Sequence, residues 1–183
     1  MMNNASAKPY LELTAFDDSG DLNVIVETPK GSRNKFGYDE TLGLFKLDGV
    51  LPAGASFPFD FGFIPATVGG DGDPLDVLLL LDESVFTGCL VAARTLGVIE
   101  AKQKERDGAT MRNDRLIAVA AKSSTHGNLK TLLKLNSSLL EEIEYFFISY
   151  NNFKGKEFMP LGRFGPERAN KLIKEGARRF QRA

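Results

Sequence analysis

The pattern of apolar and polar positions divides the chain into two parts of different character. Up to residue 121 the apolar residues either alternate with polar ones, as in 22–28, or form short runs such as 115–121. Alternation is typical of half-buried β-strands, and short apolar runs between turn residues are typical of fully buried strands. The expected strands are 22–28, 35–39, 42–47, 75–81, 88–99 and 115–121.

Turn residues connect several of these strands. We expect one hairpin whose strands are joined through Asp39 to Thr41, and a second, charged hairpin over 100–111 that turns at Asp107-Gly108. The long strand 88–99 is expected to bend at Gly97. The stretch 57–65 holds four phenylalanines within seven residues and has Pro near both ends. It predicts an apolar lining that packs on a sheet, or a wall that excludes water beside a site.

Helical periodicity appears only in the last third of the chain. Apolar residues at 139, 140, 143, 146 and 147 follow Ser137 or Ser138, either of which can cap a helix that ends near 150–152. A second helix is expected from Pro166 through Phe180. Because strands come first and helices last, the order favours an α+β fold, a small closed antiparallel β-barrel of OB-like form with helices packed outside. We expect a single domain over 1–183, with 1–20 as a peripheral or poorly ordered segment.

Composition narrows the classes of partner and location. The 183 residues carry a formal net charge of −1, so no global attraction to nucleic acid or to an anionic membrane is expected. A nucleic-acid-binding OB-like barrel would also need a basic stripe with exposed aromatic residues, and the neutral charge balance and the Pro-flanked phenylalanines argue against it. With the single Cys89, no basic and apolar leader and no window of about 18 apolar residues, we expect a cytoplasmic protein without intrachain disulfides.

The densest group of acidic residues lies immediately before an expected strand. Asp71, Asp73 and Asp76 fall within six residues, among glycines and Pro74. Such a loop suits Mg²⁺, which takes oxygen ligands and is commonly held by one or two carboxylates together with waters and substrate phosphates. A calcium loop is not supported, because the later bidentate Glu is missing. An ordinary acidic turn is the alternative, since Asp-Gly and Asp-Pro are common turn sequences.

The octapeptide at 71–78, Asp-Gly-Asp-Pro-Leu-Asp-Val-Leu, resembles the signature of the family I soluble inorganic pyrophosphatases. Further blocks resemble the same family in the same order, and together they span roughly residues 22–160. They are Val-Ile-Val-Glu27-Thr-Pro, Asn34-Lys35-Phe36, Phe45-Lys46-Leu47-Asp48, the stretch 57–65, Gly97-Val98-Ile99, the stretch 114–119, and the segment from Phe146 to Lys156. A colinear series of this length is a specific signal.

The resemblance implies a function and a set of roles. It implies hydrolysis of inorganic pyrophosphate to two phosphates, with several Mg²⁺ ions per site that Mn²⁺ or Zn²⁺ can replace, in a homo-oligomer that is commonly a hexamer in bacteria. Asp73 would take a proton from the attacking water. The implied metal ligands are Glu27, Asp71, Asp76 and, from the second acidic cluster, Asp114. The implied phosphate-binding residues are Lys35, Arg115, Tyr150 and one of Lys154 or Lys156.

Several positions depart from the family pattern. Where the family usually has charged or hydroxyl-bearing residues, this chain has Gly37, Gly49, Phe57, Phe61 and Asn151. In the second acidic cluster the expected acids fall on Gln103 and Asn113, and Asp114 lies one residue out of register. A shift of one residue turns a side chain to the opposite face of a regular strand, unless a bulge restores it. These losses keep open the alternative of a weakened or inactive relative that binds metal or phosphate ligands.

The charged segment 102–112 offers replacements for the missing groups. Glu105 or Asp107 could replace a missing metal ligand, and Arg106 or Arg112 could replace the missing Arg. The other interpretation is an ordinary solvated hairpin. Both interpretations stay open at the level of sequence.

Overall fold

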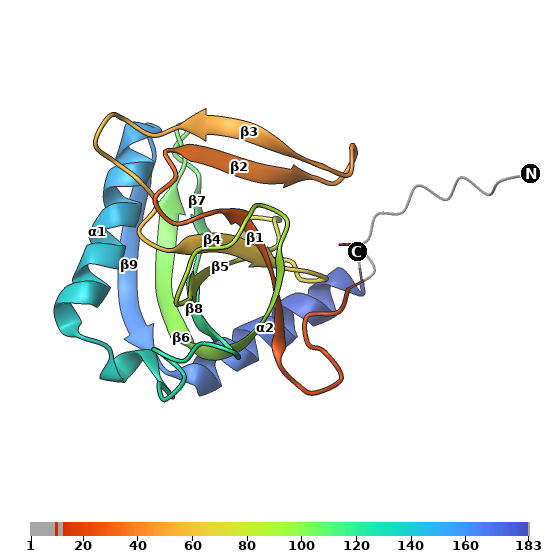
Figure 1. Cartoon of the computed structure of the whole chain (residues 1–183). Helices are drawn as coiled ribbons and strands as arrows, with labels where there is room; N and C mark the ends of the chain where they lie inside the picture. Colours follow the sequence, from red (N-terminus) through yellow and green to blue (C-terminus); the bar gives the residue numbers. More distant parts are fainter. Residues whose placement is uncertain (1–9, 11–12, 183) are drawn as a thin grey trace, which may run out of the picture.

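The computed structural model describes residues 10 and 13–182. Figure 1 shows how the strands and helices follow one another. The strands are β1 (Leu22–Thr28), β2 (Asn34–Asp39), β3 (Leu44–Val50), β4 (Asp60–Ile64), β5 (Leu75–Leu80), β6 (Leu90–Lys104), β7 (Thr110–Arg112), β8 (Arg115–Ala120) and β9 (Glu157–Phe164). The helices are α1 (Ser137–Phe153), α2 (Pro166–Phe180) and the short 3-10 helix η1 (Leu132–Lys134).

Five strands close into a ring. β1 pairs with β4, β4 with β5, β5 with β8, β8 with β6, and β6 returns to β1. The predicted α+β class with an OB-like ring of strands and helices outside is confirmed. One detail differs from the expected antiparallel arrangement, because β5 and β8 run parallel. The long segment between these strands contains β6 and β7, which gives the chain the length needed for a parallel crossover.

The long strand β6 pairs with four other strands, β1, β7, β8 and β9, over different parts of its length. Its pairing with β8 shifts register between Thr95 and Gly97, at the place where a bend was expected. A Cβ on Gly97 would collide with Leu132 and with the carbonyl oxygen of Phe164, so the close approach of η1 and β9 requires glycine there. Beyond this point β6 continues to Lys104, pairs with β7 and forms the predicted charged hairpin, which turns at 105–109.

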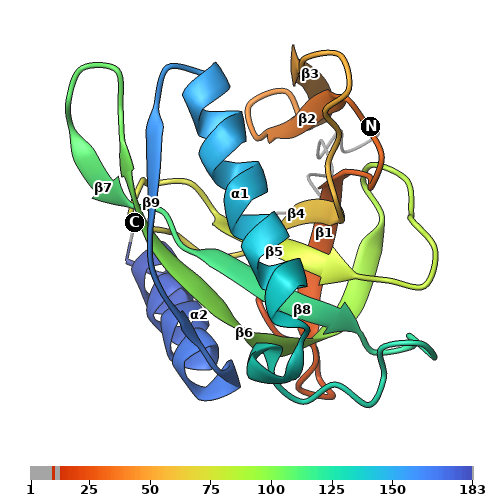
Figure 2. The same cartoon turned by 90° about the vertical axis from the view of Figure 1, so that its left-hand side faces the viewer.

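The two helices cover different parts of the ring. Helix α1 buries Leu140, Ile143 and Phe147 against a core that includes Phe61, and α2 buries Ala169 and Ile173 against a second core cluster. Figures 1 and 2 show α1 beside β9 and α2 beneath the ring, away from the β2–β3 hairpin. Among the described residues, none of the helices combines the length and apolar character needed to span a membrane.

The order of elements differs from the prediction in one respect. In the sequence, strand β9 follows α1 and precedes α2, and it pairs antiparallel with β6. The predicted order places all strands before the helices. The β9 segment contains Pro160 and Gly162, two residue types that are unfavourable inside a strand. Pro is tolerated at a sheet edge, where its missing N–H faces away from the ladder, and β9 is such an edge. Similarly, α1 is capped by Asn136, whose side chain accepts from the Ser138 N–H at 2.9 Å, and not by a serine.

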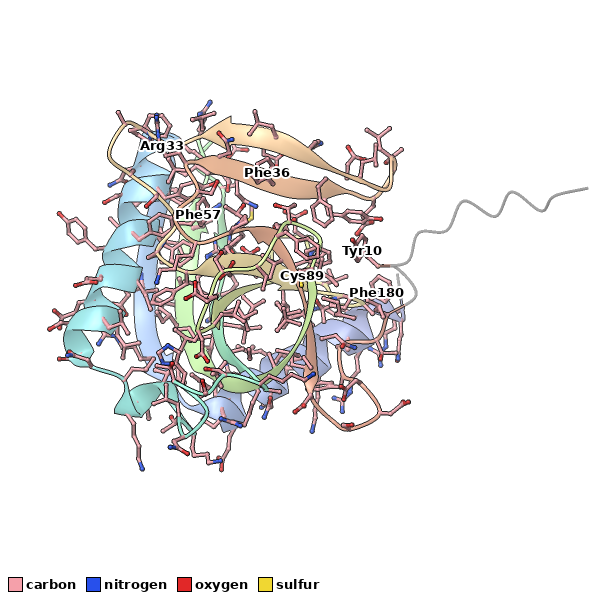
Figure 3. All side chains as sticks on the ribbon, in the orientation of Figure 1. Tyr10, Arg33, Phe36, Phe57, Cys89 and Phe180 are labelled. Carbon is pink, nitrogen blue, oxygen red and sulfur yellow. The ribbon has the colours of Figure 1, made fainter. Side chains whose placement is uncertain are left out.

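The described N-terminal residues pack against the body of the protein. Ala15 is buried, and its carbonyl oxygen accepts from the Asn23 N–H at 2.9 Å. Tyr10 packs edge-on against Tyr38 and Phe45 of the β2–β3 hairpin, with ring centroids 5.1 and 5.5 Å away. Figure 3 shows Tyr10 at one end of this hairpin and Phe57 toward its other end, beside α1. The rest of the predicted N-terminal segment, 1–9 and 11–12, lies outside the described residues.

Candidate active site

Four segments meet around one cleft. They are the β2–β3 hairpin, the acidic loop 69–76 before β5, the β6–β7 hairpin, and the C-terminal end of α1 with the residues that follow it. Figure 2 shows the two hairpins and this end of α1 reaching the same end of the molecule. The charged residues that line the cleft are Glu27, Lys35, Glu40, Lys46, Asp48, Asp71, Asp73, Asp76, Glu105, Arg115, Lys154 and Lys156.

The acidic loop is held in shape by its own backbone. The Gly69 N–H donates to the carbonyl oxygen of Asp73 at 2.6 Å, and the Asp73 N–H donates to Asp71 Oδ1 at 3.2 Å. The Thr67 hydroxyl accepts from the Leu75 N–H at 3.0 Å and so ties the loop to the start of β5. Residues close in sequence thus present three carboxylates to the same cleft.

Burial and the neighbouring carboxylates disfavour the charged forms of Asp71 and Asp73. Burial, followed by repulsion from Asp76 and Asp73, raises the pKa of Asp71 above its ordinary value. Burial and repulsion from Asp76 also raise the pKa of Asp73, against the lowering effect of Lys156. A cation bound among the three acids would remove this repulsion, so the loop is electrostatically suited to one.

Arg115 forms the floor of the cleft beside Asp76. Its Nη1 donates to Asp76 Oδ2 and to Asn113 Oδ1 in short contacts, and the Arg115 side chain is only 5% exposed. The guanidinium also lies over the rings of Phe147 and Phe158, at 4.8 and 5.5 Å from their centroids. Its position is therefore determined by the packing of α1 and β9 as well as by charge.

A second ion pair, between Lys35 and Glu27, lines the same cleft. Lys35 Nζ is 3.0 Å from Glu27 Oε2, while Glu27 Oε1 accepts from the Tyr38 N–H at 2.9 Å. Burial raises the pKa of Glu27, and Lys35 only partly offsets this effect. The Lys35 ammonium also lies 4.9 Å from the centroid of the Phe61 ring. β1 and β2 together therefore place one acid and one cation at the cleft.

The end of α1 adds a phenol and two more cations. Lys154 Nζ lies 4.5 Å from the centroid of the Tyr150 ring, and Lys156 Nζ lies 2.7 Å from Glu105 Oε2. Burial and repulsion from Lys35 and Lys156 lower the pKa of Lys154. Within the described part of the chain no carboxylate pairs with Lys154, and mutual repulsion of these ammonium groups favours an anion between them.

Comparison with known proteins decides the family. The sequence model described as inorganic pyrophosphatase matches residues 24–181. The chain belongs to the inorganic pyrophosphatase family. An inorganic pyrophosphatase from Synechocystis sp. is 35% identical over 163 residues, which cover 89% of this chain and 94% of that protein.

Solved structures agree with this assignment. The crystal structure of inorganic pyrophosphatase from Thermus thermophilus matches with a TM-score of 0.85 at 29% identity, over 94% of this chain and 98% of that one. An inorganic pyrophosphatase from Neisseria gonorrhoeae matches with a TM-score of 0.84 at 35% identity, again over 94% and 98% of the two chains. The family is metal-dependent.

Asp114 does not line the cleft, contrary to its expected role as a metal ligand, but borders a smaller adjacent pocket together with Asp71 and Asp76. Asp114 Oδ1 accepts from the Ala101 N–H at 2.9 Å, and Arg112 donates to both carboxylate oxygens, at 2.8 and 3.0 Å from Nη2. The neighbouring Asn113 and the cross-strand Gln103 face the cleft instead. Asn113 and Asp114 form the short connection between β7 and β8, where the Arg112 ion pair and the Ala101 N–H hold the Asp114 carboxylate.

The other charged residues of the β6–β7 hairpin are now placed as well. Glu105 lines the cleft of the pyrophosphatase, whereas Asp107 is exposed and accepts from the Ala109 N–H at 2.9 Å. Arg106 donates to the carbonyl oxygen of Lys154 at 2.6 Å, and Arg112 pairs with Glu100 at 2.8 Å. Neither Arg lines the cleft, so neither stands in for the missing phosphate-binding Arg in this structure.

Asp48 is one of the charged cleft residues that were not among the predicted site residues. Asp48 of β3 lines the pyrophosphatase cleft, and its carboxylate fills the space beside Gly37 on the paired strand β2. A Cβ on residue 37 would collide with Asp48 Oδ2. The sequence placed Asp48 in a family block, but only the register of the hairpin brings it next to Gly37.

The two phenylalanines that replace hydroxyl-bearing residues form an apolar wall. Phe57 packs against Phe61, Phe146 and Tyr150, with ring centroids 5.7, 5.1 and 5.8 Å apart. Both Phe57 and Phe61 are buried and belong to the α1 core cluster. The predicted apolar lining is confirmed, and part of this stretch also forms strand β4.

The residues of the cleft fit a magnesium site in which the protein supplies only a few of the ligands. Among the described residues, no three acidic, histidine or cysteine side chains are gathered as a complete metal shell. Mg²⁺ does not need one, because it is commonly held by one or two carboxylates with waters and phosphates. Seven carboxylates and five basic side chains line the cleft, so it carries excess negative charge that a divalent cation would offset.

Proposed function

We propose that this protein hydrolyses inorganic pyrophosphate to two phosphates in a Mg²⁺-dependent reaction, in which Mn²⁺ or Zn²⁺ can substitute. The observation that carries the proposal is the single cleft in which Asp71, Asp73 and Asp76 face Lys35 and Lys154. Acids that can hold metal and cations that can hold phosphate thus lie around the same space. Membership of the inorganic pyrophosphatase family supports the same chemistry.

The cations of the cleft would bind the phosphate groups. Lys154 has no carboxylate partner among the described residues and is available as it stands, while Tyr150 can donate from its hydroxyl. Lys35, Lys156 and Arg115 are paired with acids and would exchange these partners for phosphate oxygens. Charge-assisted hydrogen bonds to phosphate are strong enough to favour such an exchange when a metal takes over the acids.

Glu27, Asp71 and Asp76 are the residues that would hold metal. Bound Mg²⁺ would lower the pKa of a water molecule and offset the negative charge on the phosphate oxygens. All three carboxylates line the cleft, where Asp71 and Asp76 are half-buried and Glu27 is largely buried. Their spread around the cleft supports more than one ion.

Asp73 is the residue that would accept the proton of the attacking water. Its carboxylate accepts no hydrogen bond and forms no ion pair with any described residue. Asp71 accepts from the loop backbone and Asp76 is paired with Arg115, so both are already engaged. An unengaged carboxylate beside the metal-binding acids is placed to orient the water and take its proton.

Phosphate release tests the proposal. The purified protein is assayed with pyrophosphate and Mg²⁺ alongside Asp73→Asn and Asp76→Asn, with Asp107→Asn as a matched control on an exposed turn. We expect release that falls at least a hundredfold in the first two variants and is unchanged in the control. Release no greater than that of Asp73→Asn with Mg²⁺, Mn²⁺ or Zn²⁺ would refute the enzymatic proposal.

A second candidate function is a relative that binds metal or phosphate ligands with little hydrolysis. Two observations favour it. Gln103 and Asn113 present amides to the cleft instead of carboxylates, and Asp76 already forms an ion pair with Arg115. Calorimetric titration with pyrophosphate and Mg²⁺ distinguishes the two. Saturable binding without phosphate release supports the second candidate.

We also propose that the protein forms a homo-oligomer, with a hexamer as the expected form. Large apolar side chains are exposed on the described surface, and they include Tyr145 and Phe86 at 72% and Leu42 at 66%. Subunit contacts would bury those of these side chains that lie together in one apolar patch. Light scattering of the purified protein measures the mass. The cytoplasmic location stays a prediction from the sequence.

A further inference from the structure

The β6–β7 hairpin carries a connected series of polar groups along the wall of the cleft. Glu105 Oε2 lies 2.7 Å from Lys156 Nζ, and Glu105 Oε1 accepts from Gln103 Nε2 at 2.6 Å. Gln103 Oε1 in turn accepts from Asn113 Nδ2 at 3.1 Å. The only carboxylate in this part of the described wall is that of Glu105.

The series ends at the acidic loop. Asn113 Oδ1 accepts from Arg115 Nη1, and the same nitrogen donates to Asp76. The wall is therefore joined through hydrogen bonds to one of the proposed metal ligands on the other side of the cleft. Both amides have their oxygen atoms engaged, so neither offers a free ligand in this arrangement.

The backbone around Glu105 is anchored rather than free in solvent. The Glu105 N–H donates to the carbonyl oxygen of Ala109 at 2.8 Å, and the Gly108 N–H donates to the carbonyl oxygen of Glu105 at 3.0 Å. Arg106 holds the tip of the hairpin to the Lys154 carbonyl oxygen at 2.6 Å. The Glu105 side chain is only 21% exposed. The interpretation as a solvated hairpin therefore does not apply to this residue.

The other acids of the same region do not compete for this role. Asp114 is held by Arg112 and by the Ala101 N–H, and Asp107 closes the turn outside the cleft. Glu100 is bound by Arg112 at 2.8 Å and by Arg168 at 2.5 Å on the far side of the hairpin. Each of these acids is already held by basic side chains or backbone N–H groups, and none of them lines the cleft.

We propose that Glu105 is the cation-binding carboxylate of the hairpin wall, in place of the acids that Gln103 and Asn113 do not supply. The proposal rests on the proposed function only for the nature of the cation. Glu105 forms an ion pair with Lys156 in this structure, and a divalent cation would replace the Lys156 ammonium as the partner of the carboxylate. Lys156 would then be released toward phosphate, while Gln103 keeps the carboxylate oriented through its 2.6 Å hydrogen bond.

Direct binding of Mn²⁺, without pyrophosphate, tests the proposal. Free Mn²⁺ is measured by electron paramagnetic resonance during titration of the wild-type protein, Glu105→Gln and the matched control Asp107→Asn. We expect Glu105→Gln to weaken one bound ion at least tenfold and Asp107→Asn to bind as the wild type does. Equal stoichiometry and affinity in Glu105→Gln and the wild type would overturn the proposal. Near-ultraviolet circular dichroism confirms folding, and Glu105→Ala provides a second variant.

A double variant distinguishes direct binding of the cation by Glu105 from the effect of leaving the Lys156 charge unpaired. Glu105→Gln leaves Lys156 unpaired, which alone would repel a cation, so Glu105→Gln with Lys156→Met is titrated as well. Binding that stays weak supports direct ligation, and recovery to wild-type affinity contradicts it. A second double variant combines Glu105→Gln with Gln103→Asp and so moves the carboxylate to the neighbouring position of the wall. We expect this variant to recover at least part of the lost Mn²⁺ affinity. Phosphate release plays no part here, so failure of this proposal is distinct from failure of the proposed hydrolysis.

Discussion

The carboxylate of Asp48 occupies the space in which a side chain at residue 37 would begin, because Gly37 lies beside it on the paired strand. This contact couples a position without a side chain to an acid that lines the cleft. The absence of a side chain at residue 37 therefore does not leave this side of the cleft empty. The Asp48 carboxylate also lies within electrostatic range of Lys46 and Lys154, two of the cations that line the cleft.

The contact predicts an energetic coupling between Gly37 and Asp48. Gly37→Ala should stabilise the hairpin less in the wild type than in Asp48→Ala, because the new methyl group displaces the carboxylate only where Asp48 is present. We expect a coupling free energy of about 0.5–1 kcal/mol in a double-mutant cycle measured by urea unfolding.

Gly49→Ala is the control for this cycle. Nothing lies within 4 Å of the position of its Cβ, so its effect should add to that of Asp48→Ala. Additive effects of Gly37→Ala and Asp48→Ala would contradict the predicted contact.

Arg115 is expected to stabilise the fold as well as the cleft. Arg115→Met leaves Asp76 without its cation and leaves Asn113 without its donor. Removing one partner of a largely buried ion pair costs about 3 kcal/mol, at the lower end of the usual range because Asp76 keeps contact with solvent. Urea unfolding measures the loss. The exposed Lys122→Met should change the free energy of unfolding by less than about 0.5 kcal/mol.

Asn113→Asp is expected to strengthen divalent cation binding. Asn113 lines the cleft and contacts Arg115 beside Asp76, so a carboxylate there adds negative charge close to the proposed metal ligands. We expect Mn²⁺ to bind about tenfold more tightly, equivalent to about 1.4 kcal/mol. Titration of Asn170→Asp, on α2, controls for the added charge. Unchanged or weaker binding in Asn113→Asp would show that Arg115 cancels the new charge.

Asp82 predicts a stability change at acid pH. Its carboxylate accepts hydrogen bonds from the hydroxyls of Ser123 and Ser124, at 2.6 and 2.7 Å, and from the N–H groups of Ser124 and Thr125. These bonds hold the pKa of Asp82 well below its ordinary value. A lowered pKa in the folded state stabilises the protein above the unfolded pKa of about 3.9, and this stabilisation is lost as the pH falls below that value.

The measurement compares urea midpoints of the wild type and Asp82→Asn from pH 7 to pH 2. We expect Asp82→Asn to be less stable at pH 7 and the difference to shrink as the pH falls through and below about 4. The exposed Glu83→Gln serves as the control. A difference that is independent of pH would contradict the assigned role of the carboxylate.

The elements with strong local patterns could be predicted from the sequence. The strands at 22–28, 75–80 and 115–120 and both long helices have clear apolar periodicity, which depends only on neighbouring residues. In contrast β9 was missed, because Pro160 and Gly162 weaken its pattern and its pairing with β6 supplies what the segment itself does not specify. The parallel pairing of β5 with β8 likewise depends on the closure of the ring.

The sequence by itself determined the acidic loop, because Asp71, Asp73 and Asp76 are neighbours in the chain and a short loop can face one cleft. Only the tertiary structure decided what stands opposite them. The β6–β7 hairpin places Glu105 at the cleft, whereas the Arg112 ion pair holds Asp114 beside the adjacent pocket. The contacts of Glu105 with Lys156 and of Asp48 with Gly37 join different segments, so no local pattern encodes them.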